Sequence, residues 1–245
     1  MTPRERADRL LLARGYFETR TRAQEAIAAG CVTADGAVVR KPSDMLPVDA
    51  DIVATAAHPY VSRGGVKLAH ALDHFGIDPA GWRCLDVGSS TGGFTDVLLR
   101  RGAAHVLAVD TGRDQFHVSL RGDPRVTLME GTDIRRLEAD PAGPVALAVI
   151  DVSFIPLALV LPAVTALLAP RAVLVALVKP QFEAGRRDIG KGGIVREPAV
   201  HDRVIAAVAA TLAGLGFGVG DAIASPISGG DGNREFLIVA RRGGA

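Results

Sequence analysis

Hydrophobic and polar positions follow two different rhythms along the chain, and the change falls near residues 58–82. Beyond residue 83, short aliphatic runs alternate with longer segments of helical spacing, which is typical of a parallel, doubly wound α/β sheet. The predicted strands are 83–87, 106–109, 126–129, 145–150, 172–178, 216–222 and 235–240, and the predicted helices are 94–101, 114–120, 157–168 and 199–215.

The first part of the chain has a shorter and more basic pattern. It predicts helices over 4–14 and 21–29, a hairpin over 31–39 and a short strand over 52–54. Thr21 and Gln24 have the spacing of a capping box, and Asp35-Gly36 is a hairpin turn signal. We therefore expect a small α+β domain at 1–60, a linker and lead-in helix at 61–82 and an α/β domain at 83–245.

Composition limits the partners and the compartment. The 245 residues are 48% apolar and 22% charged, which allows a sizeable core, and the net charge is +1. Overall charge therefore predicts no polyanion partner, and any nucleic-acid contact must come from a local basic face. Cys31 and Cys84 have no metal-ligand spacing, and residues 1–12 lack a signal-peptide pattern. We expect a cytoplasmic protein without a metal.

Residues 155–178 are nearly all apolar and raise the question of a membrane span. A spanning helix needs about 20 predominantly apolar residues. Pro156, Pro162, Pro170 and Arg171 interrupt this run. The sequence therefore predicts a helix followed by a strand here, and no membrane partner.

Ionisable residues follow the predicted strands one after another. In an open α/β sheet, ligands bind beyond the carboxyl ends of the strands. A single charge at such a place is as often a helix cap as a ligand-binding group, but the whole set favours a site. These residues are Asp86 before the loop 88–93, then Asp110, Asp133, Asp151 and Lys179.

The loop 88–93 lacks both the dinucleotide pattern Gly-x-Gly-x-x-Gly and the lysine of a P-loop. Asp110 lies about 20 residues beyond it, where an acid can hold ribose hydroxyls. This pattern resembles the S-adenosylmethionine site of Rossmann-type methyltransferases, which implies that Asp133 reaches the adenine amine. The resemblance implies cofactor contacts by Asp86, Gly88, Ser89, Ser90, Thr91, Gly92, Gly93, Phe94, Asp110, Asp133 and Asp151.

Four residues are candidates for the chemistry. If the last strand runs antiparallel, Glu235 lies at the same edge as Asp151 and Lys179, and Lys67 lies on a helix just before the sheet. A ribose hydroxyl needs a proton acceptor. Lysine is a poor base at its reference pKa of about 10.4, but burial and a like charge lower such values while carboxylates oppose the shift. The hypothesis is that Lys179 takes the 2′-hydroxyl proton while the other three position the groups.

Five motifs, at residues 61–68, 86–95, 151–155, 178–183 and 232–236, together resemble the TlyA (hemolysin A) family. The resemblance spans nearly the whole chain. It implies an FtsJ-like class I methyltransferase domain, a mostly parallel sheet with an antiparallel last strand, behind a small RNA-binding domain. It also implies ribosomal RNA or ribosomal subunits as partner, 2′-O-methylcytidine as product, and catalysis by Lys67, Asp151, Lys179 and Glu235.

The order of elements in residues 4–60 resembles the alpha-L RNA-binding motif, in which the second helix and its preceding turn face RNA. From charge alone, an ordinary solvated surface is an equal alternative, and the same holds for the loop 181–197, which is either a flexible loop or an RNA clamp. Phe94 and Phe154 are expected to pack in the core rather than on a base. The RNA-contact candidates are Arg4, Arg6, Arg20, Arg22, Arg63, Arg186, Arg187 and Lys191.

Two other functions stay open at this stage. One is a membrane-active hemolysin, which the absence of a spanning pattern disfavours, and the other is a catalytically silent RNA-binding assembly factor, which the intact tetrad disfavours. The target nucleotide, the ribosomal subunit and the oligomeric state are not determined by the sequence, with a monomer favoured.

Overall fold

A computed structural model describes residues 2–137 and 143–244 and divides the chain into two compact units, Met1–Pro59 and Tyr60–Ala245. The division lies one residue before the boundary expected at residue 60. The segment 61–82, expected to be a linker and lead-in helix, belongs to the second unit and contains a helix of 13 residues.

The first unit is a small α+β structure. A three-stranded sheet of order β3-β2-β5 and a two-stranded ladder of β1 and β4 accompany two helices around one apolar core. Its elements are β1 (Arg4–Arg6), α1 (Ala7–Ala13), α2 (Arg20–Ala28), β2 (Val32–Ala34), β3 (Ala37–Val38), β4 (Met45–Pro47) and β5 (Ile52–Ala54).

Two local predictions in this unit are wrong. The first helix begins at Ala7 rather than at residue 4, because Arg4–Arg6 pair antiparallel with β4. The capping box at Thr21 is absent, since Thr19 is the N-cap and its Oγ1 accepts a hydrogen bond from the Arg22 amide at 3.3 Å. Gln24 instead donates to the Asp8 carboxylate. The Gln24 side chain, which a capping box would bond to the backbone, is therefore bonded to a residue of α1 instead.

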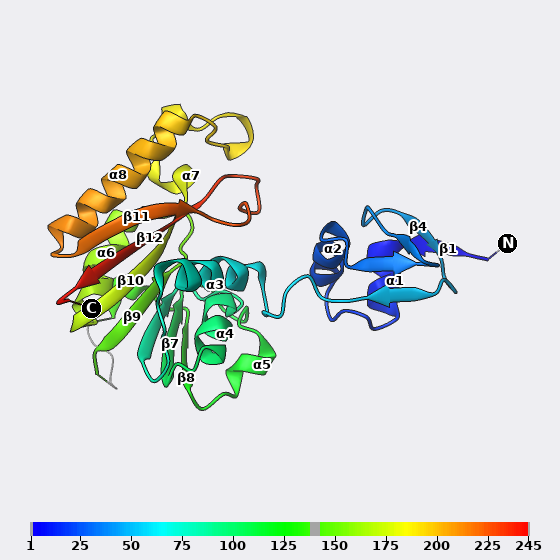
Figure 1. Cartoon of the computed structure of the whole chain (residues 1–245), viewed down its shortest axis with the longest axis horizontal. Coiled ribbons are helices and arrows are strands. Elements are labelled where there is room, and N and C mark those ends of the chain that lie inside the picture. The colour runs from blue at the N-terminus through cyan, green and yellow to red at the C-terminus, as the bar shows by residue number, and fades with distance from the viewer. Residues whose placement is uncertain (1, 138–142, 245) are drawn as a thin grey trace. The chain divides into compact units, whose positions relative to one another are not determined.

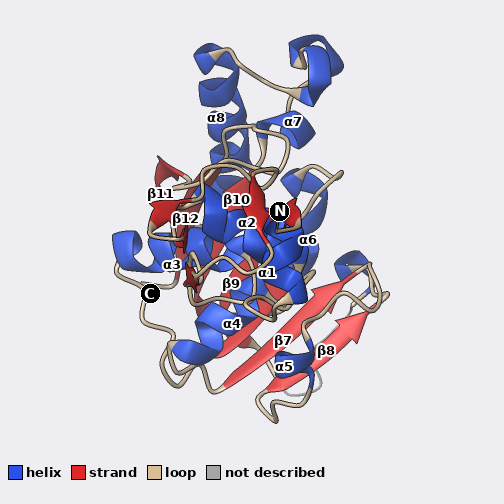
Figure 2. Ribbon diagram, turned by 90° about the vertical axis from the view of Figure 1, so that its right-hand side faces the viewer, coloured by secondary structure: helices blue, strands red, loops and turns tan. Residues whose placement is uncertain are grey.

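The second unit is built on a seven-stranded sheet of order β11-β12-β10-β9-β6-β7-β8 (Figures 1 and 2). The strands β10, β9, β6, β7 and β8 are parallel, and β12 pairs antiparallel with both β10 and β11. The predicted fold class is thereby confirmed. The strands are β6 (Arg83–Val87), β7 (His105–Asp110), β8 (Val126–Glu130), β9 (Val145–Ile150), β10 (Leu168–Val178), β11 (Gly218–Ala224) and β12 (Phe236–Arg242).

Helices cover both faces of this sheet because successive strand residues point to opposite sides. Cys84 packs with residues of α3, α4 and α5, whereas Leu85 packs with residues of α6 and α8. The result is a three-layer α/β/α arrangement. The helices are α3 (Arg63–Phe75), α4 (Gly93–Arg100), α5 (Val118–Arg121), α6 (Leu157–Ala166), α7 (Pro180–Glu183) and α8 (Pro198–Gly214), with short 3-10 turns η1 (Ile134–Arg136), η2 (Arg186–Asp188) and η3 (Lys191–Gly193).

The apolar run that raised the question of a membrane is divided as expected, with different limits. The helix α6 ends at Ala166, and β10 begins at Leu168 with a register irregularity between Leu168 and Val173, around Pro170 and Arg171. In the described part of the chain, no helix has the length and apolar character required to cross a membrane. The helix expected over 114–120 is only the four-residue α5.

Candidate active site

The glycine loop connects β6 to α4 and packs tightly against the end of β9. Gly88 has φ of 82°, and a Cβ there would collide with the backbone carbonyl of Asp151. Both the left-handed backbone and the close approach require glycine at this position. Ser90 also adopts a positive φ, of 45°. The sequence thus brings the loop and Asp151 together at one point of the sheet edge.

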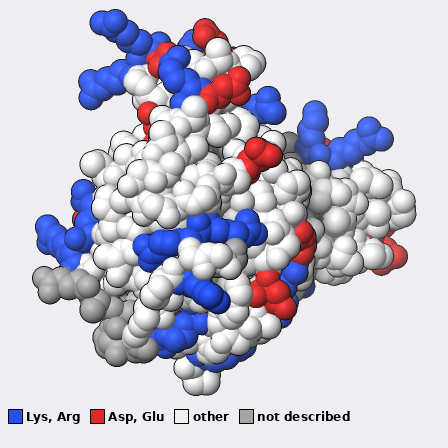
Figure 3. Space-filling model, turned by 60° about the vertical axis from the view of Figure 1, so that its left-hand side comes forward, with Lys and Arg blue, Asp and Glu red and all other residues white. Residues whose placement is uncertain are grey.

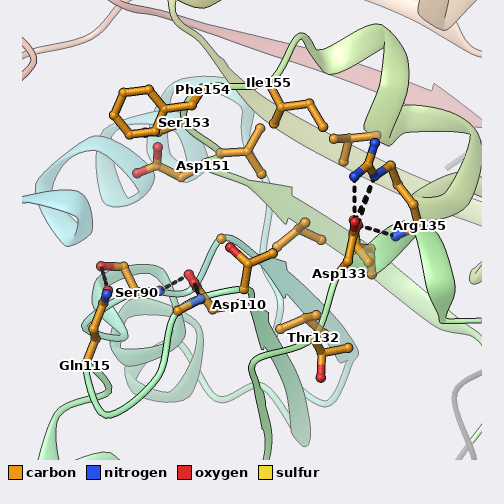
Figure 4. A pocket seen from close by; sticks show the side chains of 18 residues that line it. Ser90, Asp110, Gln115, Thr132, Asp133, Arg135, Asp151, Ser153, Phe154 and Ile155 are labelled. Carbon is orange, nitrogen blue, oxygen red and sulfur yellow. Dashed lines mark hydrogen bonds and ion pairs between the residues drawn. The ribbon is translucent and has the colours of Figure 1, made fainter.

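A cavity of about 580 Å³ opens at this edge (Figure 4). Asp110 and Ser90 lie on one wall, Asp133 with Arg135 on another, and Asp151 to Ile155 above them. The lining is mixed, with apolar side chains beside the carboxylates. It comprises Val87, Gly88, Ser90, Val109, Asp110, Thr111, Gly112, Gln115, Thr132, Asp133, Ile134, Arg135, Asp151, Val152, Ser153, Phe154, Ile155 and Val160.

Asp110 ends β7 and holds the loops on either side of it. Its two carboxylate oxygens accept backbone hydrogen bonds from Ser90 at 2.7 Å and from Gly112 at 2.6 Å. A carboxylate fixed by two amides keeps its orientation. It remains part of the cavity lining, where an acidic side chain can meet ribose hydroxyls.

Asp133 is paired with Arg135 across two hydrogen bonds, from Nε to Oδ1 at 3.0 Å and from Nη2 to Oδ2 at 2.6 Å. The bonds from Arg135 lower the pKa of Asp133 to about 2, so this carboxylate is ionised at neutral pH. The pair belongs to the cavity wall (Figure 4). Sequence reasoning found Asp133 but not Arg135.

Asp86, expected to contact the cofactor, is not among the lining residues of the large cavity. Its side chain is fully buried, and Oδ2 accepts hydrogen bonds from the amide and the hydroxyl of Thr95 at 2.9 and 2.7 Å. Burial raises the pKa of Asp86 to about 7, although the hydrogen bonds from Thr95 act in the opposite direction and lower it. Asp86 therefore stabilises the first turn of α4 through its hydrogen bonds with Thr95. Gly92 likewise lines neither cavity described here.

A second cavity, of about 120 Å³, adjoins the first and shares Gly88, Ser90 and Asp151 with it. Asp151 thus stands at the boundary between a large and a small cavity. The lining residues of the small cavity are Ser62, Gly64, Lys67, Gly88, Ser89, Ser90, Thr91, Gly93, Phe94 and Asp151.

The four residues predicted to act together form two ion pairs. Lys67 Nζ lies 2.5 Å from Glu235 Oε2, and Lys179 Nζ lies 2.6 Å from Asp151 Oδ1. The antiparallel register Val178↔Phe236 explains why Lys179 and Glu235 occupy the same edge. Lys179 also donates to Ser153 Oγ at 2.9 Å, a contact that the sequence did not indicate.

The two phenylalanines differ. Phe94 is buried in the core, as expected. Phe154 is 90% exposed, so the expectation of core packing is wrong for it. Its φ of 65° turns the side chain out of the apolar run, and its ring lies 4.9 Å from that of Phe182, between centroids, at the wall of the large cavity. Nothing in the sequence reveals that backbone conformation. Gln115 and Ile155 are further lining residues that sequence reasoning missed.

The predicted RNA-contact arginines of the first unit are already tied to the protein. Arg6 and Arg20 both pair with the buried carboxylate of Asp8, whose pKa the bonds from Arg6 hold well below its usual range. Arg4 donates to the Met45 carbonyl, and Arg22 lies 3.2 Å from a ring nitrogen of His58. These contacts fix the arginine side chains without burying them.

In the second unit, Arg63 donates to the Ser228 carbonyl at 2.8 Å, while Arg186, Arg187 and Lys191 are exposed on η2 and η3. On the face drawn in Figure 3, Lys and Arg side chains form separate groups with neutral surface between them. This agrees with a net charge near zero, so that any polyanion contact on this face is local.

The large cavity suits S-adenosylmethionine, a nucleoside that carries a cationic sulfonium and an amino-acid group. Its volume lies in the range of roughly 300–1,000 Å³ typical of small-molecule sites. Asp110 can take the ribose, the apolar Val109 and Ile134 can flank the purine, and Asp133 can take its amine. Glycine at 88 lets the loop pack against the Asp151 backbone at the edge of this cavity, a contact that a Cβ would block. The fold and this site define a class I, Rossmann-like, S-adenosylmethionine-dependent methyltransferase.

Comparison with known proteins gives the family. A family model described as FtsJ-like methyltransferase matches residues 60–242, and a model of the S4 domain matches residues 5–52. The 16S/23S rRNA (cytidine-2′-O)-methyltransferase TlyA of Mycobacterium tuberculosis strain H37Rv is 45% identical over 98% of this chain and 91% of its own length. The chain belongs to the TlyA (hemolysin A) family, with an RNA-binding S4 domain before its methyltransferase domain.

Two further relatives agree with this assignment. Hemolysin A of Brachyspira hyodysenteriae is 37% identical over 95% of this chain and 98% of its own. A solved structure of a proposed hemolysin from Streptococcus thermophilus, 43% identical, superposes with a TM-score of 0.77 over 99% of this chain and 90% of that one.

Proposed function

We propose that this enzyme transfers a methyl group from S-adenosylmethionine to the ribose 2′-hydroxyl of a cytidine in ribosomal RNA, in the cytoplasm. The observation that carries the proposal is that one member of each lysine–carboxylate pair, Lys67 of one and Asp151 of the other, lines a small cavity beside the cofactor-sized one. The name of the M. tuberculosis relative supports the choice of RNA and of cytidine. The small and the large ribosomal subunit are both candidate substrates.

Within the large cavity, Asp110 and Asp133 would hold the adenosine part of the cofactor. S-adenosylmethionine supplies, when bound, an electrophilic methyl group on a positively charged sulfur. The carboxylate of Asp151 faces both cavities and pairs with Lys179. It would therefore keep the lysine beside the place where the acceptor hydroxyl must enter.

Lys179, in the neutral amine form that it must adopt before the transfer, would accept the proton of the ribose hydroxyl and become the ammonium. A hydroxyl becomes a competent nucleophile when a base within about 3 Å takes its proton in the transition state. The amine of Lys179 is held by Asp151 on one side and by Ser153 on another, so its remaining direction is restricted. After transfer the proton stays on the lysine nitrogen, where Asp151 stabilises it.

The Lys67–Glu235 pair would orient the hydroxyl rather than take its proton. Both side chains are buried, and Lys67 lines the small cavity whereas Glu235 does not. A buried ammonium whose charge is balanced by one carboxylate can donate a hydrogen bond to the ribose oxygen without a change in protonation. This donor would hold the oxygen in line for Lys179.

Phe154 and the exposed basic residues would contact RNA. A 90% exposed aromatic ring beside the cavity can stack on a base turned out of its helix. Arg186, Arg187 and Lys191 would contact phosphates near the site, and Arg4, Arg6, Arg20, Arg22 and Arg63 would extend the contact. The cofactor set proposed from the sequence is kept except for Asp86 and Gly92, for which we propose a structural role.

A membrane-active hemolysin is the second candidate, because the B. hyodysenteriae relative carries that name. The two cavities and ion pairs have no use in that function. Lysis of erythrocytes by purified protein with Asp110→Ala would support the hemolysin, and lysis absent from the wild type would remove it. An RNA-binding assembly factor without catalysis is the third candidate.

The testing experiment is transfer of labelled methyl from S-adenosylmethionine to purified small and large ribosomal subunits that lack the modification. Digestion to nucleosides then identifies the product. We expect label in 2′-O-methylcytidine of at least one subunit. Label in a base or in protein would overturn the proposed acceptor, and cofactor binding without any transfer would favour the assembly factor.

A further inference from the structure

The turn between β11 and β12 contains the only asparagine of the chain, Asn233, and its side chain is 1% exposed. Its Oδ1 accepts a hydrogen bond from the Val195 amide, and its Nδ2 donates one to the Gly193 carbonyl, both at 3.0 Å. A side-chain amide offers an acceptor and donors on one short group. Here the oxygen and the nitrogen of the amide both bond to one backbone segment, which lies nearly 40 residues earlier in the chain.

That segment is the end of the basic loop, defined as residues 184–197, which carries Arg186, Arg187 and Lys191. The base of the loop is fixed, since Val195 is buried in the core and its carbonyl lies 3.0 Å from His201 Nε2. The basic side chains farther out are exposed. In Figure 1 the yellow loop after α7 and the orange-red turn before β12 project from the same edge of the sheet. Asn233 therefore links the basic loop directly to that turn.

The same turn sets the position of Glu235. The Gly229 amide donates to the Asn233 carbonyl at 2.9 Å, which closes the turn, and a Cβ on Gly229 would lie 2.5 Å from Glu235 Oε1. The Ser228 carbonyl accepts from Arg63, on the first turn of the helix that carries Lys67. The turn thus touches the basic loop on one side, and on the other it touches Glu235 and, through Arg63, the helix that carries Lys67.

We propose that Asn233 is a positioning residue that couples the basic loop to the Lys67–Glu235 pair, so that RNA contact by the loop aligns the pair. The proposal deepens the proposed function and rests on it for the identity of the substrate. A buried amide that spans two segments transmits displacement because neither segment can move without breaking a buried hydrogen bond. The coupling itself is a property of the free protein.

Asn233→Ala and Asn233→Asp test the positioning role. We expect kcat on the ribosomal subunit to fall roughly ten-fold, less than the hundred-fold that a misplacement of about 1 Å can cost. The affinity for S-adenosylmethionine, measured by calorimetry, should stay unchanged. Asn233→Asp keeps the shape but cannot donate to Gly193, so it should lose at least as much as the alanine variant.

Val208→Ala is the matched control, because Val208 is a buried residue of α8 and its loss lowers stability without removing a contact of the turn. It should lower Tm and leave kcat unchanged. If folded Asn233→Ala protein turns over at the wild-type rate, or if Val208→Ala loses as much kcat at equal stability, the positioning role is refuted.

A double-mutant cycle tests the coupling. Replacing Arg186 and Arg187 together by glutamine should raise KM for the subunit and also lower kcat in the wild type, because loop contact no longer aligns the pair. In the Asn233→Ala background the same replacement should change KM alone. If the arginine replacement lowers kcat by the same factor in the wild type and in the Asn233→Ala background, the coupling is overturned.

Hydrogen exchange on the full chain without RNA separates this inference from the proposed function. In Asn233→Ala, amides of 190–195 and of 228–235 should both exchange faster than in the wild type. A turn that exchanges as slowly as in the wild type would overturn the coupling, whatever RNA proves to be methylated. Faster exchange in both segments would support it even if no RNA accepts the methyl group.

Discussion

The two ion pairs of the active site use the same residue types in different surroundings. In the Lys67–Glu235 pair the side chains are 10% and 3% exposed, and the carboxylate lines neither cavity. In the Lys179–Asp151 pair they are 11% and 20% exposed, and the carboxylate lines both. A buried pair costs desolvation and is kept in place by its neighbours, whereas a pair at a cavity can exchange partners with a ligand. The first pair is suited to hold the acceptor, and the second to react with it.

The largest effect is expected for Lys179→Ala. Loss of a general base typically costs about 10²–10⁴-fold, so kcat should fall roughly 10³-fold. Binding of S-adenosylmethionine should persist, since Lys179 is not part of the large cavity wall. Single-turnover methyl transfer at saturating cofactor measures the effect. Transfer at the normal rate would refute the proposed difference between the two pairs, because Lys179 would then not be the base.

Glu235→Gln should have the next largest effect, and on two properties. We expect kcat to fall about ten- to a hundred-fold and the free energy of unfolding to fall by about 1–3 kcal/mol, because Lys67 loses its buried counter-charge. Urea denaturation and methyl-transfer kinetics measure the two quantities separately.

The control for Glu235→Gln removes both charges. Lys67→Met with Glu235→Leu should recover the free energy of unfolding, because apolar groups of similar shape often replace a buried pair without loss. Activity should stay low. An active double variant would mean that the buried pair has no part in orienting the hydroxyl.

Phe154→Ala should raise KM for the ribosomal subunit by about ten-fold and leave Tm unchanged. Stacking on a base contributes about 1–3 kcal/mol, whereas a ring that is 90% exposed contributes little to folding. Phe154→Trp should retain the wild-type KM. A fall in Tm with an unaltered KM would instead indicate that contact with Phe182 is the purpose of the ring.

Asp86→Asn should change stability with pH. The pKa of Asp86 is raised by burial to about 7, above its ordinary value, so the folded state binds this proton more tightly than the unfolded state. Its contribution to stability is present at low pH and is lost as the pH rises through about 7. The free energy of unfolding of Asp86→Asn, relative to that of the wild type, should therefore rise by on the order of 2 kcal/mol between pH 5 and pH 8. Denaturation curves at both values measure this, and parallel curves would contradict the raised pKa.

The sequence predicted the sheet and the tetrad because both depend on periodicity and strand ends. Asp151 and Lys179 follow adjacent parallel strands, and an antiparallel last strand was enough to bring Glu235 to them. The alternation of strands and helices determines that edge without knowledge of side-chain packing.

The remaining features depend on local backbone angles or on distant partners. The outward turn of Phe154 requires a positive φ that its sequence neighbours do not indicate. Gln24 has the spacing of a cap but bonds Asp8, 16 residues away. Asp86 occupies the motif position of a ligand-binding acid, yet its carboxylate is fully buried and accepts a hydrogen bond from the Thr95 hydroxyl. For Gln24 and Asp86 a contact with a residue outside the local pattern decides the outcome, and for Phe154 the backbone angle does.

The most direct test of the central claim is single-turnover methyl transfer by Lys179→Arg. Arginine keeps the positive charge and can pair with Asp151, but it does not lose its proton in proteins. If Lys179 takes the hydroxyl proton, Lys179→Arg should bind S-adenosylmethionine normally and transfer methyl as slowly as Lys179→Ala. A rate near that of the wild type would contradict the account, because charge alone would then suffice at this position.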